Sequence, residues 1–255
     1  AAARATWLDA NPEYGHQLHV DGDCRAFIRS HYAPVVLEAY DTLRPGAYKA
    51  DLWRYCYLYI HGGVFADIDT CCRLPLREVL ADGDGFVSAL TPTQCRYDIW
   101  QGFLAAREGH PFLAAAIAQV VTNTQYAFYG RNSVWPTGPA ALGIAINRLA
   151  GLADLHPYVA GGNERCGEHF RLLDRPHKSK EIQMETGQVC IHAKYDGYLR
   201  QVEAQTIGYR QAWRDREVYE PRRNSLWKRL FQRKADADGR MPLAKRLDAS
   251  RLLTA

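Results

Sequence analysis

Apolar and polar residues alternate along this chain with two different periods, one typical of helices and one of strands. In residues 49–60, KADLWRYCYLYI, apolar residues recur at intervals of three and four, which predicts a helix with one apolar stripe. Gly62 and Gly63 end that helix, because glycine reaches positive φ without steric cost. Residues 64–69, VFADID, then form a predicted strand that ends in two carboxylates. A helix, turn and strand in this order indicate an α/β fold.

The same patterns predict elements on both sides of this unit. Upstream, residues 14–20 alternate like a strand, DGD at 21–23 is typical of a turn, and residues 23–40 have helical periodicity broken near Pro34. Downstream, the predicted elements are a strand at 85–90, a helix from about Pro111, a loop and helix over 135–150, and a strand from 187 that runs into a polar loop. No repeat or linker interrupts the chain before about residue 220, so residues 1–220 are predicted to form one domain.

Composition agrees with a globular protein. Hydrophobic residues make up 47% of the 255 residues and charged residues 24%, and no apolar run is long enough to span a bilayer. The seven cysteines are odd in number and lack CxxC spacing, which argues against a zinc ribbon or a dense disulfide framework and predicts reduced thiols. Reduced thiols and an excess of Arg over Lys favour a bacterial cytoplasm. The chain starts AAARATW, without Met, and a lost N-terminal anchor would instead allow a Golgi lumen.

Positive charge is concentrated in a predicted C-terminal tail, residues 221–255. This tail has ten Lys or Arg and three Asp, a net +7, so the overall +4 leaves −3 on the rest of the chain. Residues 224–234, NSLWKRLFQRK, set apolar residues among basic ones at helical spacing. Such a helix either packs its apolar stripe on the body, which we favour slightly, or makes a peripheral contact with an anionic membrane. No basic and aromatic module accompanies it, so nucleic acid is not an expected partner.

Two carboxylates, Asp67 and Asp69, follow the predicted strand at 64–69. We expect both carboxylates to meet one ion only where the chain turns at the end of this strand. Mg2+ and Mn2+ prefer carboxylate oxygens and leave positions open for phosphate, so this pair is a candidate diphosphate anchor. Acidic triplets are often solvated turns. Here, however, the acidic triplet follows an apolar strand. An unpaired carboxylate is costly to bury in such a place, which distinguishes Asp67 and Asp69 from a solvated turn.

Residues 49–69, KADLWRYCYLYIHGGVFADID, resemble the DXD-containing sugar-nucleotide glycosyltransferases. This family includes the yeast initiating α-1,6-mannosyltransferase and the inositol-phosphorylceramide mannosyltransferases. The resemblance includes an Asp and an Arg three apart on the helix, the double glycine and the DXD motif, and it extends over most of residues 7–213. It implies a single α/β domain of GT-A type, Rossmann-like, with a mixed, mainly parallel central sheet flanked by helices. It also implies retaining transfer of a hexose from a UDP- or GDP-sugar to a glycan or glycolipid acceptor, with Mn2+ or Mg2+.

The resemblance also assigns roles to the DXD motif and to the C-terminal strand. Asp69 would ligate the metal directly, and Asp67 would contact the ribose and the metal, directly or through water. His192 would approach the metal or the diphosphate, with Lys194 close by. The alternative for His192 is a hydrogen-bonded core histidine.

The helix and its glycines receive donor-binding roles from the same resemblance. Asp51 and Arg54 would hydrogen-bond the hydroxyls of the donor sugar, and Gly62 and Gly63 would reverse the chain so that these side chains and the DXD motif meet. The alternative for Asp51 and Arg54 is an exposed i,i+3 salt bridge worth a few tenths of a kcal/mol.

Two features depart from the family, and two other functions compete. The family usually has a further N-terminal strand that this sequence does not contain, and Gln101 stands where Asn is frequent. VFADIDTC also matches the haloacid-dehalogenase phosphatase signature, although a helix with Asp51 and Arg54 precedes it. The third possibility is a non-catalytic remnant that binds carbohydrate or a nucleotide sugar.

Overall fold

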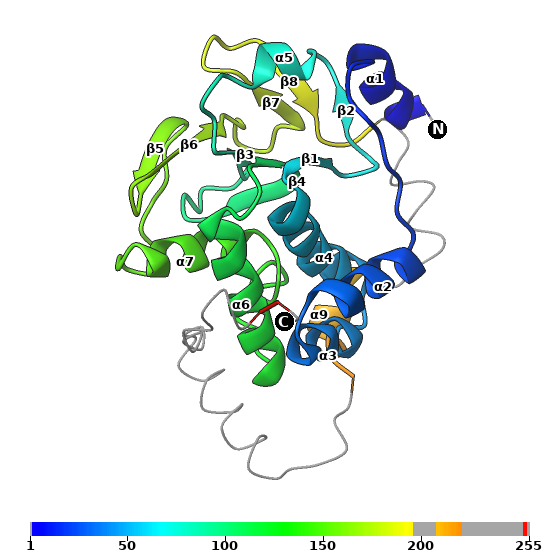
Figure 1. Cartoon of the computed structure of the whole chain (residues 1–255). Coiled ribbons are helices and arrows are strands. Elements are labelled where there is room, and N and C mark those ends of the chain that lie inside the picture. The colour runs from blue at the N-terminus through cyan, green and yellow to red at the C-terminus, as the bar shows by residue number, and fades with distance from the viewer. Residues whose placement is uncertain (1, 196–207, 221–251, 254–255) are drawn as a thin grey trace.

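A five-stranded sheet lies at the centre of the fold, and a three-stranded sheet packs beside it (Figure 1). The computed structural model describes residues 2–195, 208–220 and 252–253. The central sheet has the order β1 (Gly63–Ala66), β4 (Ile99–Ala106), β3 (Phe86–Leu90), β6 (Glu168–Leu173), β5 (Gly161–Arg165). The small sheet has the order β2 (Cys71–Cys72), β8 (Val189–His192), β7 (Glu181–Gln183).

Strand directions confirm a mixed sheet, but the prediction of a mainly parallel one is wrong. In the central sheet, β1 and β3 each pair antiparallel with β4, and β5 pairs antiparallel with β6. Only the β3 and β6 pair of this sheet is parallel. The connections explain this, because residues 91–98 and 166–167 are too short for a crossover and turn the chain straight back. The connection from β3 to β6 includes two helices and is long enough for a parallel return.

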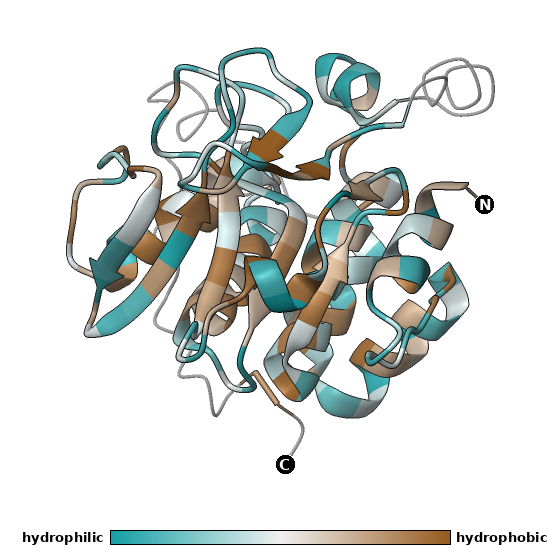
Figure 2. Ribbon diagram, turned by 90° about the horizontal axis from the view of Figure 1, so that it is seen from above, coloured by the Kyte–Doolittle hydropathy of each residue, from teal (hydrophilic) through white to brown (hydrophobic). Residues whose placement is uncertain are grey.

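Helices cover one face of the central sheet, and the small sheet covers the other together with α1 (Ala2–Ala10) and α5 (Leu76–Val79) (Figure 1). The helices are α1 (Ala2–Ala10), α2 (Asp21–His31), α3 (Pro34–Thr42), α4 (Gly46–His61), α5 (Leu76–Val79), α6 (Pro111–Gln125), α7 (Pro139–Leu149) and α9 (Tyr209–Arg214). Because side chains alternate across a strand, Phe86 and Leu104 pack toward α4 and α6, whereas Val87 and Phe103 pack toward the small sheet. The inner strands are accordingly mostly apolar in Figure 2.

Most of the elements expected from periodicity are present. The helix at 49–60 is α4, the strand at 85–90 is β3, and α6 begins at Pro111 as predicted. The predicted break near Pro34 separates α2 from α3, with this proline at the first turn of α3. All seven cysteines are free thiols.

Two upstream predictions are wrong. Residues 15–20 pair with no strand in the described chain, and DGD at 21–23 is the first turn of α2 rather than a turn between elements. The carboxylate of Asp23 accepts a hydrogen bond from the backbone N–H of Val20, 3.3 Å away. Acidic side chains are favourable at a helix N-terminus, so the triplet starts the helix.

The C-terminal prediction lies mostly outside the described residues. The amphipathic helix at 224–234 falls there entirely, and the domain boundary at residue 220 stays a prediction. Among the described helices, none combines the length and apolar character that a bilayer crossing requires.

Gly62 makes the reversal between α4 and β1 possible. It has φ 61°, and a Cβ at this position would lie 2.8 Å from the backbone nitrogen of Glu108. Gly63 has φ 96°, but a Cβ there would meet no atom within 4 Å. Both glycines adopt a conformation that L-residues avoid, and only the first is also crowded by backbone.

We expect Gly62→Ala to destabilise the protein more than Gly63→Ala. Backbone strain of roughly 1–3 kcal/mol applies to both variants. The clash with Glu108 adds to it only at residue 62. Urea denaturation of the two variants measures the difference, and equal free energies of unfolding would contradict the role of close packing at Gly62.

Asp98 is a buried carboxylate just before β4. It is 4% exposed, and its Oδ1 has no hydrogen-bond partner among the described residues. Burial raises the pKa of Asp98 from 3.8 to about 7. The native state therefore holds this proton more tightly than the unfolded chain does. The resulting stabilisation is complete below about pH 4 and is lost as the pH rises through about 7.

Asp98→Asn should remove this pH dependence. Relative to the wild type, the variant should gain stability as the pH rises from about 4 to about 7, by at most roughly 4 kcal/mol. Denaturation in urea across that pH range tests this. Parallel pH profiles for the two proteins would show that Asp98 titrates normally.

Candidate functional site

Arg54 joins three elements from inside the protein. Its side chain is 5% exposed and extends from α4, with Nη2 3.4 Å from Asp51 Oδ1 and Nη1 3.1 Å from Asp67 Oδ1. Nη1 also donates a hydrogen bond of 2.6 Å to the carbonyl oxygen of Gln101 on β4. The guanidinium lies over the ring of Phe65, 4.3 Å from its centroid. The exposed-salt-bridge alternative is therefore wrong, because this ion pair is buried.

Asp51 is buried beside this cation. Its Oδ2 accepts a 2.7 Å hydrogen bond from the hydroxyl of Thr137, which precedes α7. Burial, with a smaller contribution from the charge of Asp67, raises the pKa of Asp51 to about 6 against the lowering effects of Arg54 and Thr137. For Arg54, burial lowers the pKa, but Asp67 and Asp51 outweigh it and the net shift is upward. The guanidinium thus stays charged.

The DXD motif forms the turn that a shared ligand requires. After β1, the backbone N–H of Thr70 donates to the carbonyl oxygen of Asp67 over 2.9 Å, and the Thr70 hydroxyl donates to the same oxygen over 2.6 Å. Asp69 is 8% exposed. Burial and then the charge of Asp67 raise the pKa of Asp69 to about 6, while Lys194 and Arg54 oppose this. The two carboxylates therefore act on each other across the turn.

The small sheet brings Lys194 to Asp69. Cys71 of β2 is opposite His192 of β8, so the segments that precede β2 and follow β8 lie side by side. The backbone N–H of Tyr195 donates to the carbonyl oxygen of Asp69 over 3.0 Å, which fixes the two segments together. The charge of Lys194 acts on Asp69, and its predicted role beside the diphosphate stays a prediction.

His192 lies at the end of β8 with one nitrogen engaged. Its Nδ1 is 2.9 Å from the carbonyl oxygen of Lys194, and a carbonyl only accepts, so this nitrogen carries the proton. The other nitrogen, Nε2, then has a lone pair, which is the usual state of a metal-binding histidine. No cluster of three or more His, Cys, Asp or Glu side chains forms a closed metal site in the part of the chain that the structure describes.

The donor set nevertheless fits a hard divalent cation. Asp67 and Asp69 supply carboxylate oxygens on one turn, and their mutual repulsion would be relieved by positive charge between them. Mg2+ is commonly held by one or two carboxylates together with water and substrate phosphates. An open pair of carboxylates suits this arrangement better than a closed cage.

A cleft of about 530 Å³ runs from this turn along β1 and α4. Arg54 and Asp67 line one part of it, and residues 14–19 form the opposite wall. Inside the cleft, the ring of His19 is 4.8 Å from the rings of both Trp53 and Tyr57. Aromatic faces of this kind stack with sugars and bases. Sequence analysis missed them, although the spacing of Trp53 and Tyr57 on α4 was a usable signal.

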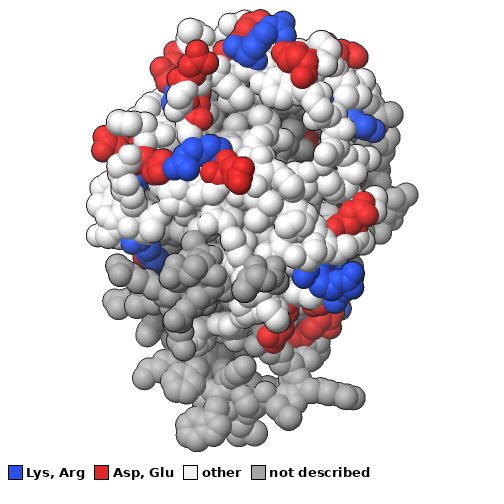
Figure 3. Space-filling view, viewed as in Figure 1, with Lys and Arg blue, Asp and Glu red and all other residues white. Residues whose placement is uncertain are grey.

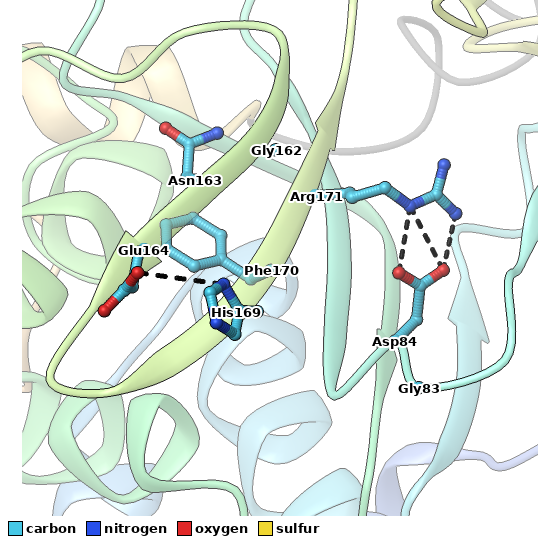
Figure 4. Close-up of a pocket in the computed structure, with 8 residues that line it drawn as sticks. All are labelled: Gly83, Asp84, Gly162, Asn163, Glu164, His169, Phe170 and Arg171. Atoms are coloured by element: carbon cyan, nitrogen blue, oxygen red, sulfur yellow. Dashed lines mark hydrogen bonds and ion pairs between the residues drawn. The ribbon is translucent and has the colours of Figure 1, made fainter.

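A second hollow, of about 320 Å³, lies at the β5 and β6 hairpin (Figure 4). There Arg171 donates to both oxygens of Asp84, with Nε 2.9 Å from Oδ1, so these charges already satisfy each other. β5 is at the opposite edge of the central sheet from β1. The hollow contains none of the predicted site residues, and the cleft beside β1 is the better candidate.

Gln101 is structural. Its side-chain amide donates to the carbonyl oxygen of Thr137 over 3.3 Å, and it is 3% exposed. It therefore ties β4 to the segment before α7.

On the molecular face of Figure 3, described basic and acidic side chains are interspersed, without one large patch of a single sign.

Sequence comparison identifies the class to which this site belongs. The family described as "Glycosyltransferase sugar-binding region containing DXD motif" matches residues 1–86, which include α4, both glycines and the DXD turn. Residues 1–86 of the chain are therefore similar to the DXD-containing glycosyltransferases, as the motif predicts. This match favours a glycosyltransferase over the phosphatase interpretation of the same aspartates.

Proteins named as mannosyltransferases are among the relatives that match this chain. The chain is 31% identical over 141 residues to "Initiation-specific alpha-1,6-mannosyltransferase" of Candida albicans, a match that covers 47% of this chain and 36% of the relative. It is 32% identical over 147 residues to "Inositol phosphoceramide mannosyltransferase 3" of Schizosaccharomyces pombe, covering 56% and 38%. The chain thus spans little more than a third of either relative. A solved structure, "PaToxG Glycosyltransferase", aligns over 40% of this chain and 34% of its own, with 19% identity and a TM-score of 0.31.

We expect Arg54→Met to destabilise the fold by roughly 3–5 kcal/mol, because it leaves the buried carboxylate of Asp51 without its cation. Arg25→Met is the matched control. Arg25 pairs with Asp41 at the surface, with side chains 46% and 39% exposed, and its removal should cost at most about 1 kcal/mol. Urea denaturation measures both. Similar losses in the two variants would show that the Arg54 network contributes no more than a surface pair.

Proposed function

We propose that this protein transfers a hexose, with retention of configuration, from a UDP- or GDP-sugar to a glycan or glycolipid acceptor. The observation that carries this is the Arg54 network: Arg54 and Asp67 of the DXD turn line the cleft, and Asp51 on α4 pairs with Arg54 behind it. The family match supports the sugar-nucleotide donor. The names of both relatives describe mannosyl transfer, so a mannosyl donor is the first candidate. The proposed architecture is the GT-A type.

In this proposal the sugar lies over the buried ion network. Arg54 lines the cleft, and its guanidinium has more donors than its described partners use, so it can hydrogen-bond a sugar hydroxyl. Asp51 accepts from a second hydroxyl and orients Arg54. Gly62 and Gly63 act indirectly, by reversing the chain between these residues and the DXD turn. The rings of Trp53 and Tyr57 extend the cleft as stacking surfaces.

The diphosphate lies at the DXD turn. Asp67 and Asp69 would hold Mn2+ or Mg2+, which supplies positive charge against the diphosphate. Lys194 adds a cation whose charge acts on Asp69. His192, at the end of β8, is the further residue that the family resemblance adds to this site. These groups stabilise the charge that develops on the leaving group.

The transfer exchanges two bonds at C1 of the sugar. The bond between C1 and the diphosphate oxygen breaks, and its electron pair stays on that oxygen. The acceptor hydroxyl oxygen bonds to C1, and its proton passes to the departing diphosphate. Charge is therefore balanced within the site, and the positive groups around Asp69 act on the atom where charge appears.

Asp69→Asn should abolish metal-dependent release of nucleoside diphosphate from the sugar donor. The expected loss is about 100-fold or more, since several kcal/mol of charge stabilisation depend on the metal. The measurement uses a panel of UDP- and GDP-sugars, with Mn2+ or with EDTA. Asp41→Asn, at the exposed ion pair with Arg25, is the control and should retain activity.

Two other outcomes would reject this function. Turnover that survives Asp69→Asn or EDTA would remove the metal from the proposal. Binding of UDP or GDP without turnover of any donor would instead favour the non-catalytic binding protein. The second outcome counts against transfer only if a form of the protein extended at its N-terminus also fails to turn over any donor.

A further inference from the structure

Two chain segments cross between the central and small sheets, and they meet at the DXD turn. One connects β1 to β2 and contains Asp67 and Asp69. The other connects β6 to β7 and contains Arg175. The charge of Asp69 acts on Arg175, yet the two side chains form no ion pair within the described residues.

Arg175 is held by Trp100 of β4. Its guanidinium lies over the indole ring, 4.8 Å from the ring centroid. Its Nε donates a 3.0 Å hydrogen bond to the carbonyl oxygen of Ser179. Within the described parts of the chain, the two terminal nitrogens of Arg175 take part in no hydrogen bond. The orientation of the guanidinium is thus fixed while its outer donors remain available.

Gly102 allows Trp100 to take this position. A Cβ on Gly102 would lie 2.2 Å from Trp100 Cζ2 and 2.9 Å from Asp67 Oδ2. The indole and the Asp67 carboxylate therefore both lie against the bare backbone of residue 102. Because the backbone N–H of Asp67 also donates to the Gly102 carbonyl oxygen over 2.9 Å, β4 fixes the ring and the carboxylate relative to each other.

Arg175 keeps its positive charge and forms no ion pair among the described residues. Burial lowers the pKa of Arg175 to about 10, against the opposing effect of Asp69, so the side chain stays protonated at neutral pH. Arg54, in contrast, already pairs with two carboxylates. Trp100 and Arg175 are both partly exposed, so an anion can reach them.

We propose that Arg175, held in place by Trp100, binds the diphosphate of the sugar donor beside Asp69. This assignment rests on the proposed function and adds a residue to it. A planar guanidinium presents two parallel donors that match a phosphate group, whereas a lysine offers a point charge. Arg175 is a diphosphate-binding residue, and Trp100 is a positioning residue.

The test is calorimetric binding of GDP and UDP, with Mn2+ present. Arg175→Gln should raise the Kd of the nucleoside diphosphate that binds by roughly 10- to 100-fold, the usual range for a lost hydrogen bond to a charged group. Arg175→Lys should fall between this variant and the wild type, because charge is kept and the fork is lost. Binding of the matching nucleoside, guanosine or uridine, should not change. Trp100→Leu should weaken diphosphate binding less than Arg175→Gln.

Arg165→Gln is the matched control. The guanidinium of Arg165 also stacks on an aromatic ring, 5.3 Å from the centroid of Tyr158, but β5 is at the opposite edge of the sheet. The charge change is identical, and the Kd should equal that of the wild type. Melting temperatures of all variants show whether each is folded.

The outcomes separate this inference from the function on which it rests. A wild-type protein that binds neither GDP nor UDP overturns both. A wild type that binds, with a folded Arg175→Gln variant within twofold of its Kd, overturns only the role of Arg175. Equal weakening of nucleoside and nucleoside diphosphate also overturns it, because the lost contact would then not be to phosphate.

Discussion

The buried guanidinium of Arg54 is the interaction on which the geometry of the site depends. A cation taken out of water is tolerated only where carboxylates and carbonyl oxygens surround it. Here those partners come from α4, from the turn after β1, and from the Gln101 carbonyl on β4. Satisfying this one charge therefore fixes a helix, a turn and a strand relative to one another. The contacts of Arg54 therefore stabilise the fold and also hold the proposed site in its geometry.

The local part of this arrangement could be predicted from sequence. The apolar stripe of α4, the glycines that end it and the short strand before the DXD motif are all encoded within about 20 residues. Proline at the first turn of α3, α6 and α7 marks where those helices begin, since its fixed φ suits this position. The turn at Asp67 was also expected, because two carboxylates could share an ion only there.

The non-local part could not be predicted. β4 supplies the Gln101 carbonyl and positions Trp100, yet residues 99–106 have no periodicity that separates a buried strand from a buried helix. Arg175 lies more than 70 residues beyond Trp100, and nothing in the intervening sequence indicates that the two side chains stack. The prediction of a mainly parallel sheet was wrong for a related reason. Strand direction depends on connections that local patterns do not specify.

The small sheet gives the site a different kind of stability from the core. β2 contains two residues, and it connects to β8 through two residue pairs. Asp69 and Lys194 are both attached to this short ladder, whereas Arg54 belongs to the large helical core. Local opening is easiest where few buried contacts and ladder bonds must be broken. The two halves of the site therefore rest on different supports, one on a ladder of two residue pairs and the other on a helix of the core.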